Sequence, residues 1–345
     1  MPRQANQPPN DFVNGSGPVS QQTSSISVVI PVYNSMRTLA TCLNSVLEAL
    51  GRVSSSELIV IDNGSTDGGF ELLQRAYTHV ARIDQIKGRT IASLRNSGAR
   101  LAQGQYLSFL DSDCVVLPAY FEKAMRVFAQ VHPDATGCKY DLPPQPHWIE
   151  ETWQTLHRRP QDGYVEYLNA GNFIIKREVF EKVGGFDENL ATDEDADLGW
   201  RLRAAGFRIY EASDVSAVHL GNPKSLRSFF QKEAWHGLGM FNLRKHSVFD
   251  KVLLATFLHC CLLLLAVIGI ILPRVPASGR LGLALFGLLF VPSLTLAFRF
   301  AKLGRVYRPL RCLLLYWIFF GAKSSAMGTY IYRRLRRDTS TRWKN

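Results

Sequence analysis

The chain has 345 residues, a formal net charge of +11 and 46% hydrophobic residues. This length allows one sizeable domain and an appended segment. The basic residues gather in the last third of the chain beside apolar segments, and no nucleic-acid-binding signature appears, so we expect a membrane surface and no nucleic acid as a partner. The six cysteines lack metal-ligand spacing, which argues against zinc and disulfides and favours a reducing environment.

Residues 1–25 are rich in Pro, Gln, Asn and Ser and have no apolar core. This composition predicts a disordered lead-in and not a signal peptide.

Short apolar segments alternate with helical patterns through the first third of the chain. The expected strands are 26–30, 58–61 and 106–110. The first expected helix is capped by Asn34 or Ser35 and has apolar positions from Leu39 to Leu50, and the next two are 70–77 and 96–101. Alternating strands and helices predict an open, mostly parallel α/β sheet with right-handed crossovers. Ligands of such sheets bind beyond the carboxyl ends of the strands.

Two carboxylates close the third strand, at Asp111 and Asp113. A buried carboxylate needs a partner, and two together need a cation or strong donors. Mg²⁺ or Mn²⁺ shared with a phosphorylated ligand meets that need. The alternative is an Asx-type turn at a strand end. Asp62 follows the second strand at the same edge of the sheet, so the two acidic turns should converge on one crevice.

The pattern is irregular between residues 139 and 165, where prolines precede a stretch rich in Trp and His. A further strand is expected at 169–175, and its Gly171 allows another group to approach the backbone closely. Four carboxylates within residues 193–197 then lead into a helix expected at 198–205. The helix macrodipole offsets part of their repulsion, by roughly 0.3–1 kcal/mol per charge. The alternative is a solvated, well-capped helix start.

Several motifs follow one another in order along residues 26–220. They are SVVIPVYN at 27–34, IDNGSTD at 61–67, RNSG at 95–98, FLDSD at 109–113, GGFDE at 184–188 and EDADL at 194–198. Together they resemble the family 2 glycosyltransferases of the GT-A fold, and the ordered set is far more specific than any one motif. The resemblance implies a twisted, mostly parallel sheet with a Rossmann-like nucleotide-binding half and an acceptor half, over residues 26–223.

The resemblance also implies roles in binding a nucleotide-sugar donor. Pro31 and Tyr33 would shape the first nucleotide-contacting turn, and Asp62 would hydrogen-bond the base. Asn63 stands where many members have a second Asp, which leaves the base open. Arg95 would face the diphosphate, and its alternative is an exposed arginine at a helix start.

The remaining implied roles concern the metal and the chemistry. Asp111 would reach the ribose or the metal, and Asp113 would ligate Mg²⁺ or Mn²⁺ directly. His219 stands where some relatives place a further metal ligand, and its alternative is a satisfied structural histidine. Asp195 matches the catalytic base of inverting members, which activates an acceptor hydroxyl and is typically worth 10²–10⁴-fold in rate.

One departure from the family bears on the product. Processive relatives carry a Gln-x-x-Arg-Trp signature, whereas this chain keeps Gln231 and Trp235 but has Ala234 in place of the arginine. We therefore expect transfer of a single sugar. The alternatives are transfer to a polyprenyl monophosphate, which needs no base, and a non-catalytic membrane scaffold. A nucleotidyltransferase would need a Gly-rich basic loop after the first strand, which is missing.

The C-terminal third predicts a membrane segment over residues 251–345. Spans are expected at about 252–272 and 281–298, and the basic segment 299–311 should stay in the cytoplasm together with the catalytic domain. A third apolar helix at 312–332 is either interfacial or spanning, and the basic tail after it favours the interfacial placement. Residues 224–250 predict an earlier interfacial helix or, equally, a helix that covers the domain. An active site held at the inner or plasma membrane suggests a lipid-linked glycan acceptor of surface polysaccharide synthesis.

Overall fold

The computed structural model describes residues 25–157, 162–239, 251–272 and 276–335. The predicted disordered lead-in falls almost entirely outside the described residues, as do 240–250 of the predicted interfacial segment and the end of the basic tail.

Ten strands and eleven helices make up the described part of the chain. The strands are β1 (Ile26–Val32), β2 (Ser56–Asp62), β3 (Arg82–Gln85), β4 (Tyr106–Leu110), β5 (Cys114–Val116), β6 (Ala135–Gly137), β7 (Gly163–Val165), β8 (Asn172–Lys176), β9 (Ile209–Glu211) and β10 (Ala217–His219). The helices are α1 (Met36–Leu50), α2 (Gly69–Ala76), α3 (Ile91–Leu101), α4 (Tyr120–Val131), α5 (Trp148–His157), α6 (Arg177–Lys182), α7 (Glu194–Ala204), α8 (Leu226–Gly237), α9 (Lys251–Ile271), α10 (Ala277–Leu303) and α11 (Pro309–Leu335).

The main sheet has eight strands in the order β3-β2-β1-β4-β8-β6-β9-β7. The first four are parallel, as predicted, whereas β8 runs antiparallel to both β4 and β6, and β7 runs antiparallel to β9. A separate two-stranded ladder joins β5 to β10. The mostly parallel α/β prediction is confirmed, and the carboxyl ends of β1, β2 and β4 lie at one edge.

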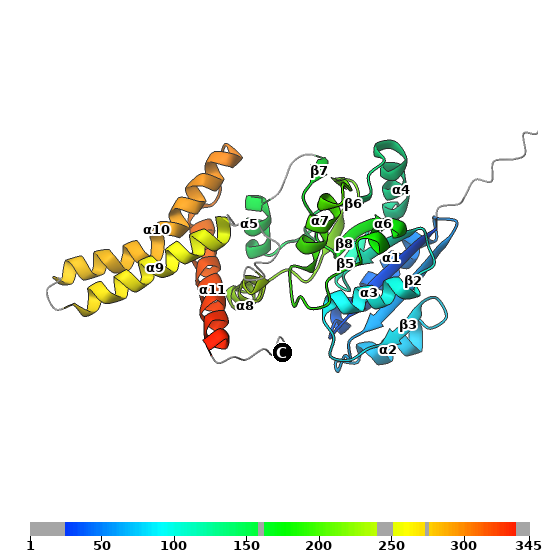
Figure 1. The fold of residues 1–345 in the computed structure, drawn as a ribbon, viewed down its shortest axis with the longest axis horizontal. Coiled ribbons are helices and arrows are strands. Elements are labelled where there is room, and N and C mark those ends of the chain that lie inside the picture. Colours follow the sequence, from blue (N-terminus) through cyan, green and yellow to red (C-terminus); the bar gives the residue numbers. More distant parts are fainter. Residues whose placement is uncertain (1–24, 158–161, 240–250, 273–275, 336–345) are drawn as a thin grey trace, which may run out of the picture.

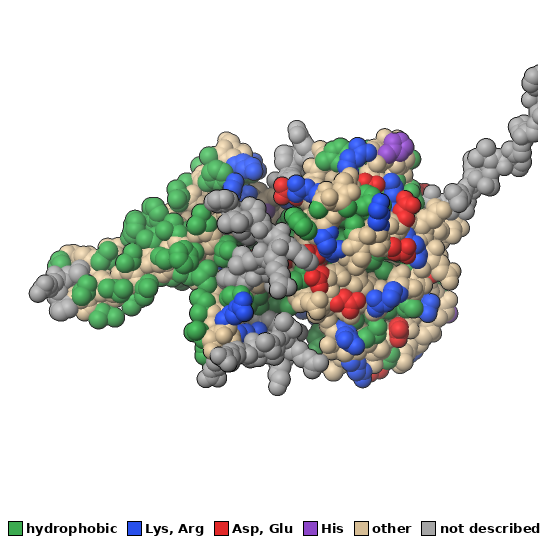
Figure 2. All heavy atoms as spheres, viewed as in Figure 1, with side chains coloured by type: hydrophobic (Ala, Val, Ile, Leu, Met, Phe, Trp, Pro, Cys, Tyr) green, Lys and Arg blue, Asp and Glu red, His purple; other side chains and the backbone are tan. Residues whose placement is uncertain are grey.

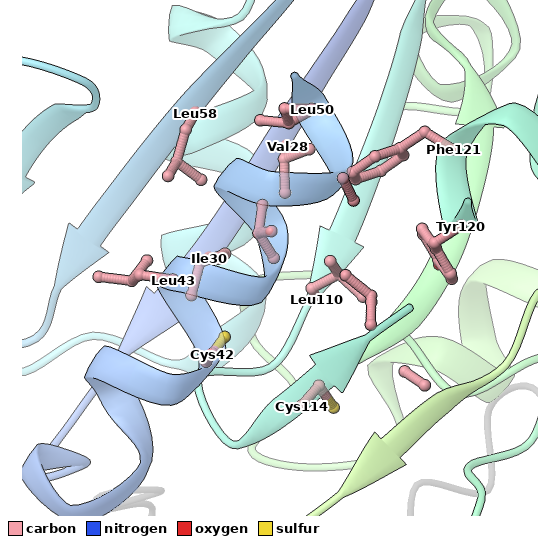
Figure 3. Close-up of a cluster of buried hydrophobic side chains, with 14 of the residues drawn as sticks. Val28, Ile30, Cys42, Leu43, Leu50, Leu58, Leu110, Cys114, Tyr120 and Phe121 are labelled. Atoms are coloured by element: carbon pink, nitrogen blue, oxygen red, sulfur yellow. The ribbon is translucent and has the colours of Figure 1, made fainter. Parts of the chain in front are cut away.

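Alternate side chains of the central strands enter two separate cores. Val28 and Ile30 pack with α1 and α4 on one face, and Val29 packs with α3, α6 and α7 on the other. Figure 3 shows the first core, with Leu43 and Leu50 of α1 lying against β1. This period of two is expected for a strand buried on both faces. The same alternation decides which residues at the strand ends point their side chains toward the carboxyl edge of the sheet.

Two helix boundaries differ from the predictions. α3 begins at Ile91 instead of residue 96, because the Thr90 hydroxyl accepts a hydrogen bond from the Ser93 N–H and caps the helix. α7 begins at Glu194 instead of residue 198, so the acidic residues lie inside the first helical turn, where the macrodipole stabilises them.

The C-terminal helices form an arm beside the α/β domain (Figure 1). α9 and α10 pair as a hairpin, and α10 is bent in Figure 1. It contains the internal Pro292, which lacks the N–H needed for the helical ladder. Both are long and apolar enough to cross a membrane, and 22% of each apolar window is buried. Apolar side chains cover the visible face of this hairpin (Figure 2). This is modest support for membrane association.

α11 runs across the hairpin in Figure 1, not along it, and although it has 27 residues it is not apolar enough to count as a span with α9 and α10. One face of α11 packs against the α/β domain, where Leu315 contacts Ile149 of α5 and Phe229 of α8. Lys323 of α11 also forms a buried ion pair with Glu233 of α8, at 3.2 Å. The interfacial placement of α8 and α11 stays a prediction.

Candidate active site

Three predicted metal ligands meet at the carboxyl end of β4. Asp111 and Asp113 follow that strand, and His219 ends β10, which the ladder to β5 brings alongside. Ligand atoms of the three residues lie within 4.8 Å of one another, and Asp113 Oδ1 is 3.4 Å from His219 Nε2. Asp113 Oδ1 and His219 Nδ1 are buried without a hydrogen-bond partner among the described residues. Two carboxylates and an imidazole with free buried acceptors fit Mn²⁺ or Mg²⁺.

The protonation states agree with this assignment. Burial lowers the pKa of His219, although the Asp113 and Asp111 carboxylates oppose that change. The imidazole is therefore neutral at neutral pH, which is the form that ligates a metal. Burial raises the pKa of Asp113, and the nearby Asp111 charge adds to the effect. A divalent cation beside these groups would favour their ionised forms.

Two glycines let the backbone pass close to these carboxylates. A Cβ atom at Gly221 would lie 1.8 Å from Asp113 Oδ2, and one at Gly171 would lie 2.0 Å from Asp111 Oδ2. Side chains at either position would therefore displace a carboxylate. The prediction that Gly171 permits a close approach is confirmed, and the approaching group is Asp111.

Asp111 is held by residues from two other segments of the chain. Arg95 Nη2 lies 2.6 Å from Asp111 Oδ1, and the Tyr140 hydroxyl donates to Asp111 Oδ2 at 3.1 Å. Burial alone would raise the pKa of Asp111, but the charge of the Arg95 guanidinium and the hydrogen bonds from Arg95 and Tyr140 outweigh it and hold that pKa below its ordinary value. Asp111 is therefore ionised and fixed in orientation.

Arg95 also reaches the acidic start of α7. Its Nη1 atom lies 2.6 Å from Glu194 Oε1, and only 2% of the residue is exposed. The alternative of an exposed helix-start arginine is therefore wrong. Arg95 bridges Asp111 and Glu194 in this structure, and its predicted contact with a diphosphate stays a prediction.

Asp195 follows Glu194 and lies on the first turn of α7. It borders a small cavity lined mainly by apolar side chains, among them Leu168, Ala170 and Phe173. This burial, together with the Glu194 charge, raises the pKa of Asp195 to about 7. A carboxylate with that pKa is well suited to accept a proton near neutral pH.

Hydrogen bonds join the turn after β1 to the turn after β2. The backbone N–H of Asn34 donates to Ser65 Oγ at 3.0 Å, and the N–H of Thr66 donates to Asn34 Oδ1 at 2.8 Å. Pro31 is buried in β1, whereas Tyr33 is 43% exposed at the edge. The structure thus places the predicted nucleotide-contacting turn beside the Asp62 turn.

Asp62 is fully buried, and its own turn uses both of its oxygens. Oδ1 accepts from the N–H groups of Gly64 and Ser65 and from Gln85 Nε2, and Oδ2 accepts from the Ser65 hydroxyl. Its predicted contact with a nucleotide base stays a prediction.

Sequence reasoning missed Tyr140 and the bridging role of Glu194. Tyr140 lies in the irregular segment and belongs to no motif, so only the fold places it against Asp111 and 4.6 Å from the His219 ring. The sequence did point to Glu194, because this residue stands next to Asp195 in the EDADL motif. A hollow of about 600 Å³ is lined mainly by residues of α3, α6 and the turn that follows α6, and it includes none of these carboxylates. We place the site by its chemistry.

The comparison with solved structures supports the fold class. A mannosyltransferase from Pyrobaculum calidifontis, PcManGT, solved with GDP-Man and Mn²⁺, is similar over 92% of this chain and 89% of its own, with a TM-score of 0.55 and 17% identity. The fold is therefore of the GT-A type. Residues 106–320 match the model for glycosyl transferase family group 2, and residues 27–184 match that for glycosyl transferase family 2. The chain belongs to glycosyltransferase family 2.

Curated relatives share about a quarter to a third of the matched residues. The glycosyltransferase AglE of Haloferax volcanii is 27% identical over 205 residues, which is 57% of this chain and 67% of that protein. The validoxylamine A glucosyltransferase of Streptomyces hygroscopicus is 30% identical over 220 residues, 53% of this chain and 52% of that protein. The chain thus spans about half to two thirds of the length of these two relatives.

Proposed function

We propose that this protein transfers one sugar from a nucleotide-sugar donor to an acceptor hydroxyl, with inversion at the anomeric carbon. The observation that carries the proposal is the buried bridge Asp111–Arg95–Glu194, which joins the candidate metal ligands to the helix start that holds Asp195. Metal ligands and a candidate base are thereby held in one rigid unit. The family assignment and the GT-A fold agree with this chemistry.

Each of these residues has its own role in the proposed reaction. Asp113 and His219 would hold Mn²⁺ or Mg²⁺ with Asp111, and such an ion stabilises charge that develops on a leaving diphosphate. Asp195 would accept the proton of the acceptor hydroxyl as that oxygen attacks the anomeric carbon. A single displacement needs no second, nucleophilic carboxylate and inverts the configuration.

The acceptor is proposed from the placement of the domain. α9 begins and α10 ends on the side of the arm next to the catalytic domain (Figure 1). If this hairpin crosses the inner or plasma membrane, the catalytic domain lies at the cytoplasmic surface, because the basic residues after α10 stay in the cytoplasm. A lipid-linked glycan is the acceptor class that is available at that surface.

The test is metal-dependent binding of a nucleoside diphosphate. Calorimetry with UDP and GDP, with and without Mn²⁺, should show metal-dependent binding in the wild type and a loss of roughly 10²-fold in Asp113→Ala. Glu48→Ala, which removes an exposed carboxylate on α1, is the matched control and should bind as the wild type does. Equal affinity with and without metal would reject the site.

The reaction itself is tested on the same preparation. Purified protein, offered a panel of nucleotide-sugars with Mn²⁺, should release nucleoside diphosphate, and NMR should find inverted product. A product that retains the configuration of the donor would reject single displacement.

A further inference from the structure

The end of α10, the turn that follows it and the start of α11 present cations and bare apolar side chains together. We name as the basic turn the set Lys302, Arg305, Val306, Leu310 and Arg311. All five are exposed, Val306 to 69% and Leu310 to 82%. None of the three cations makes a hydrogen bond or an ion pair within the part of the chain that the structure describes. Such a surface is complementary to an anionic, partly apolar partner.

The basic turn is held in place from the protein side. Arg308 Nη1 pairs with Glu151 Oε2 of α5 at 2.7 Å, and the Tyr307 hydroxyl donates to Glu151 Oε1 at 3.0 Å. Arg311 lies over the ring of Trp148, 5.5 Å from its centroid. The surface is therefore preformed, so binding a partner loses little conformational entropy.

Its position in the fold points to the partner. The basic turn lies where α10 ends and α11 begins, at the end of the hairpin that lies next to the catalytic domain (Figure 1). Figure 2 shows the hairpin covered by apolar side chains, with Lys and Arg side chains gathered where the arm approaches the catalytic domain. A hairpin that crosses a bilayer would place the basic turn at headgroup level.

We propose that the basic turn docks onto anionic headgroups of the bilayer, with Val306 and Leu310 entering the acyl boundary. This inference rests on the membrane placement in the proposed function. Each Lys or Arg near an anionic surface strengthens binding about fivefold, so three cations together contribute roughly 10²-fold. Exposed apolar side chains among cations are typical of segments that lie in the interface.

Docking of the basic turn would set the distance between the active site and the bilayer surface. Glu151 holds the basic turn, and three residues further along α5 Gln154 Nε2 donates to the backbone oxygen of Tyr140 at 2.7 Å. Tyr140 in turn holds Asp111. A short chain of hydrogen bonds therefore links the docked surface to the metal edge, which keeps the site at a constant distance from a lipid-linked acceptor.

The test places a polarity-sensitive thiol dye at Leu310→Cys in the full chain. Cys260 and Cys261 are changed to Ala, because the other cysteines are buried. The protein is reconstituted into phosphatidylcholine vesicles with or without about one third phosphatidylglycerol. The dye emission should shift to shorter wavelength with phosphatidylglycerol and return at high salt, because salt screens the attraction.

Two triple variants distinguish an effect of the basic turn from an effect of the protein's overall positive charge. Lys302→Gln, Arg305→Gln and Arg311→Gln combined should reduce the ratio of docked to undocked protein roughly 10²-fold and abolish the lipid response. The matched control removes three exposed cations on the catalytic domain, Arg52→Gln, Arg75→Gln and Arg126→Gln, and should keep the response.

The outcomes distinguish the proposals. Wild type that floats with the vesicles but emits alike in both lipids, or a basic-turn variant that keeps the response, overturns docking and leaves the hairpin placement intact. Vesicle flotation by density centrifugation shows whether the protein is bound to the bilayer. Wild-type protein that fails to float with the vesicles overturns the membrane placement and docking with it. No sugar transfer is measured, so a failed transferase assay bears on neither result.

Discussion

Replacing Asp195 by Asn should raise stability and abolish most activity in the same protein. Burial first, and the Glu194 and Asp193 charges next, raise the pKa of the Asp195 carboxyl from its ordinary 3.8 to about 7, although Arg95 acts in the opposite direction. The folded state therefore binds a proton more tightly than the unfolded state does. Stability from this group is present below pH 4 and is lost as pH rises toward 7.

The magnitude follows from the two pKa values. Holding Asp195 ionised at pH 8 costs the folded protein up to about 4 kcal/mol, because each tenfold change in proton affinity is worth about 1.36 kcal/mol. Asn keeps the size of the side chain and removes the charge. Asp195→Asn should therefore unfold at a temperature higher by roughly 5–15 °C at pH 8, and this gain should disappear as pH approaches 4.

The activity should change in the opposite direction. Wild-type turnover should rise with pH through about 7 as Asp195 becomes the ionised base. Asp195→Asn should lower turnover by roughly 10²–10⁴-fold and remove that rise, while nucleoside diphosphate affinity stays the same. Thermal unfolding at pH 4.5 and 8 and steady-state turnover across pH are the measurements. Asp214→Asn, at an exposed position, is the control.

Two results would refute the reasoning. Loss of stability at pH 8 would assign Asp195 to holding the start of α7 instead of to the chemistry. Near-normal turnover would remove it as the base and favour an acceptor that is already ionised, such as a polyprenyl monophosphate.

Arg95→Met should destabilise the protein by about 3–5 kcal/mol, seen as a lower unfolding temperature, because it leaves Asp111 and Glu194 buried without their cation; an unchanged temperature would mean that the bridge contributes nothing. Lys323→Met should destabilise to a similar extent by stranding Glu233 between α8 and α11, and the double change with Glu233→Met should recover most of the loss. A double variant no more stable than Lys323→Met would contradict the buried pair as the cause. If α9 and α10 span the membrane and α11 does not, a reporter fused to the C-terminus should read as cytoplasmic, whereas a signal from the opposite side would mean that α11 spans as well.

Much of the candidate site could be read from local patterns. Asp111 and Asp113 stand out because they end an apolar strand, and Gly171 stands out because glycine inside a strand permits close approach. His219 carried little local signal, since a lone histidine after a short strand is often structural. The ladder between β5 and β10 is what sets it beside Asp113.

By itself, the sequence determined the parallel half of the sheet, the family and the two apolar helices, because period-two strands, ordered motifs and long apolar runs are local properties. Only the tertiary structure decided that β8 runs antiparallel beside β4, that Tyr140 holds Asp111 and that Arg95 is buried between two carboxylates. Arg95 and its partner Glu194 are 99 residues apart in the chain. No local pattern encodes such a contact, because burial and charge pairing arise only when distant segments pack together.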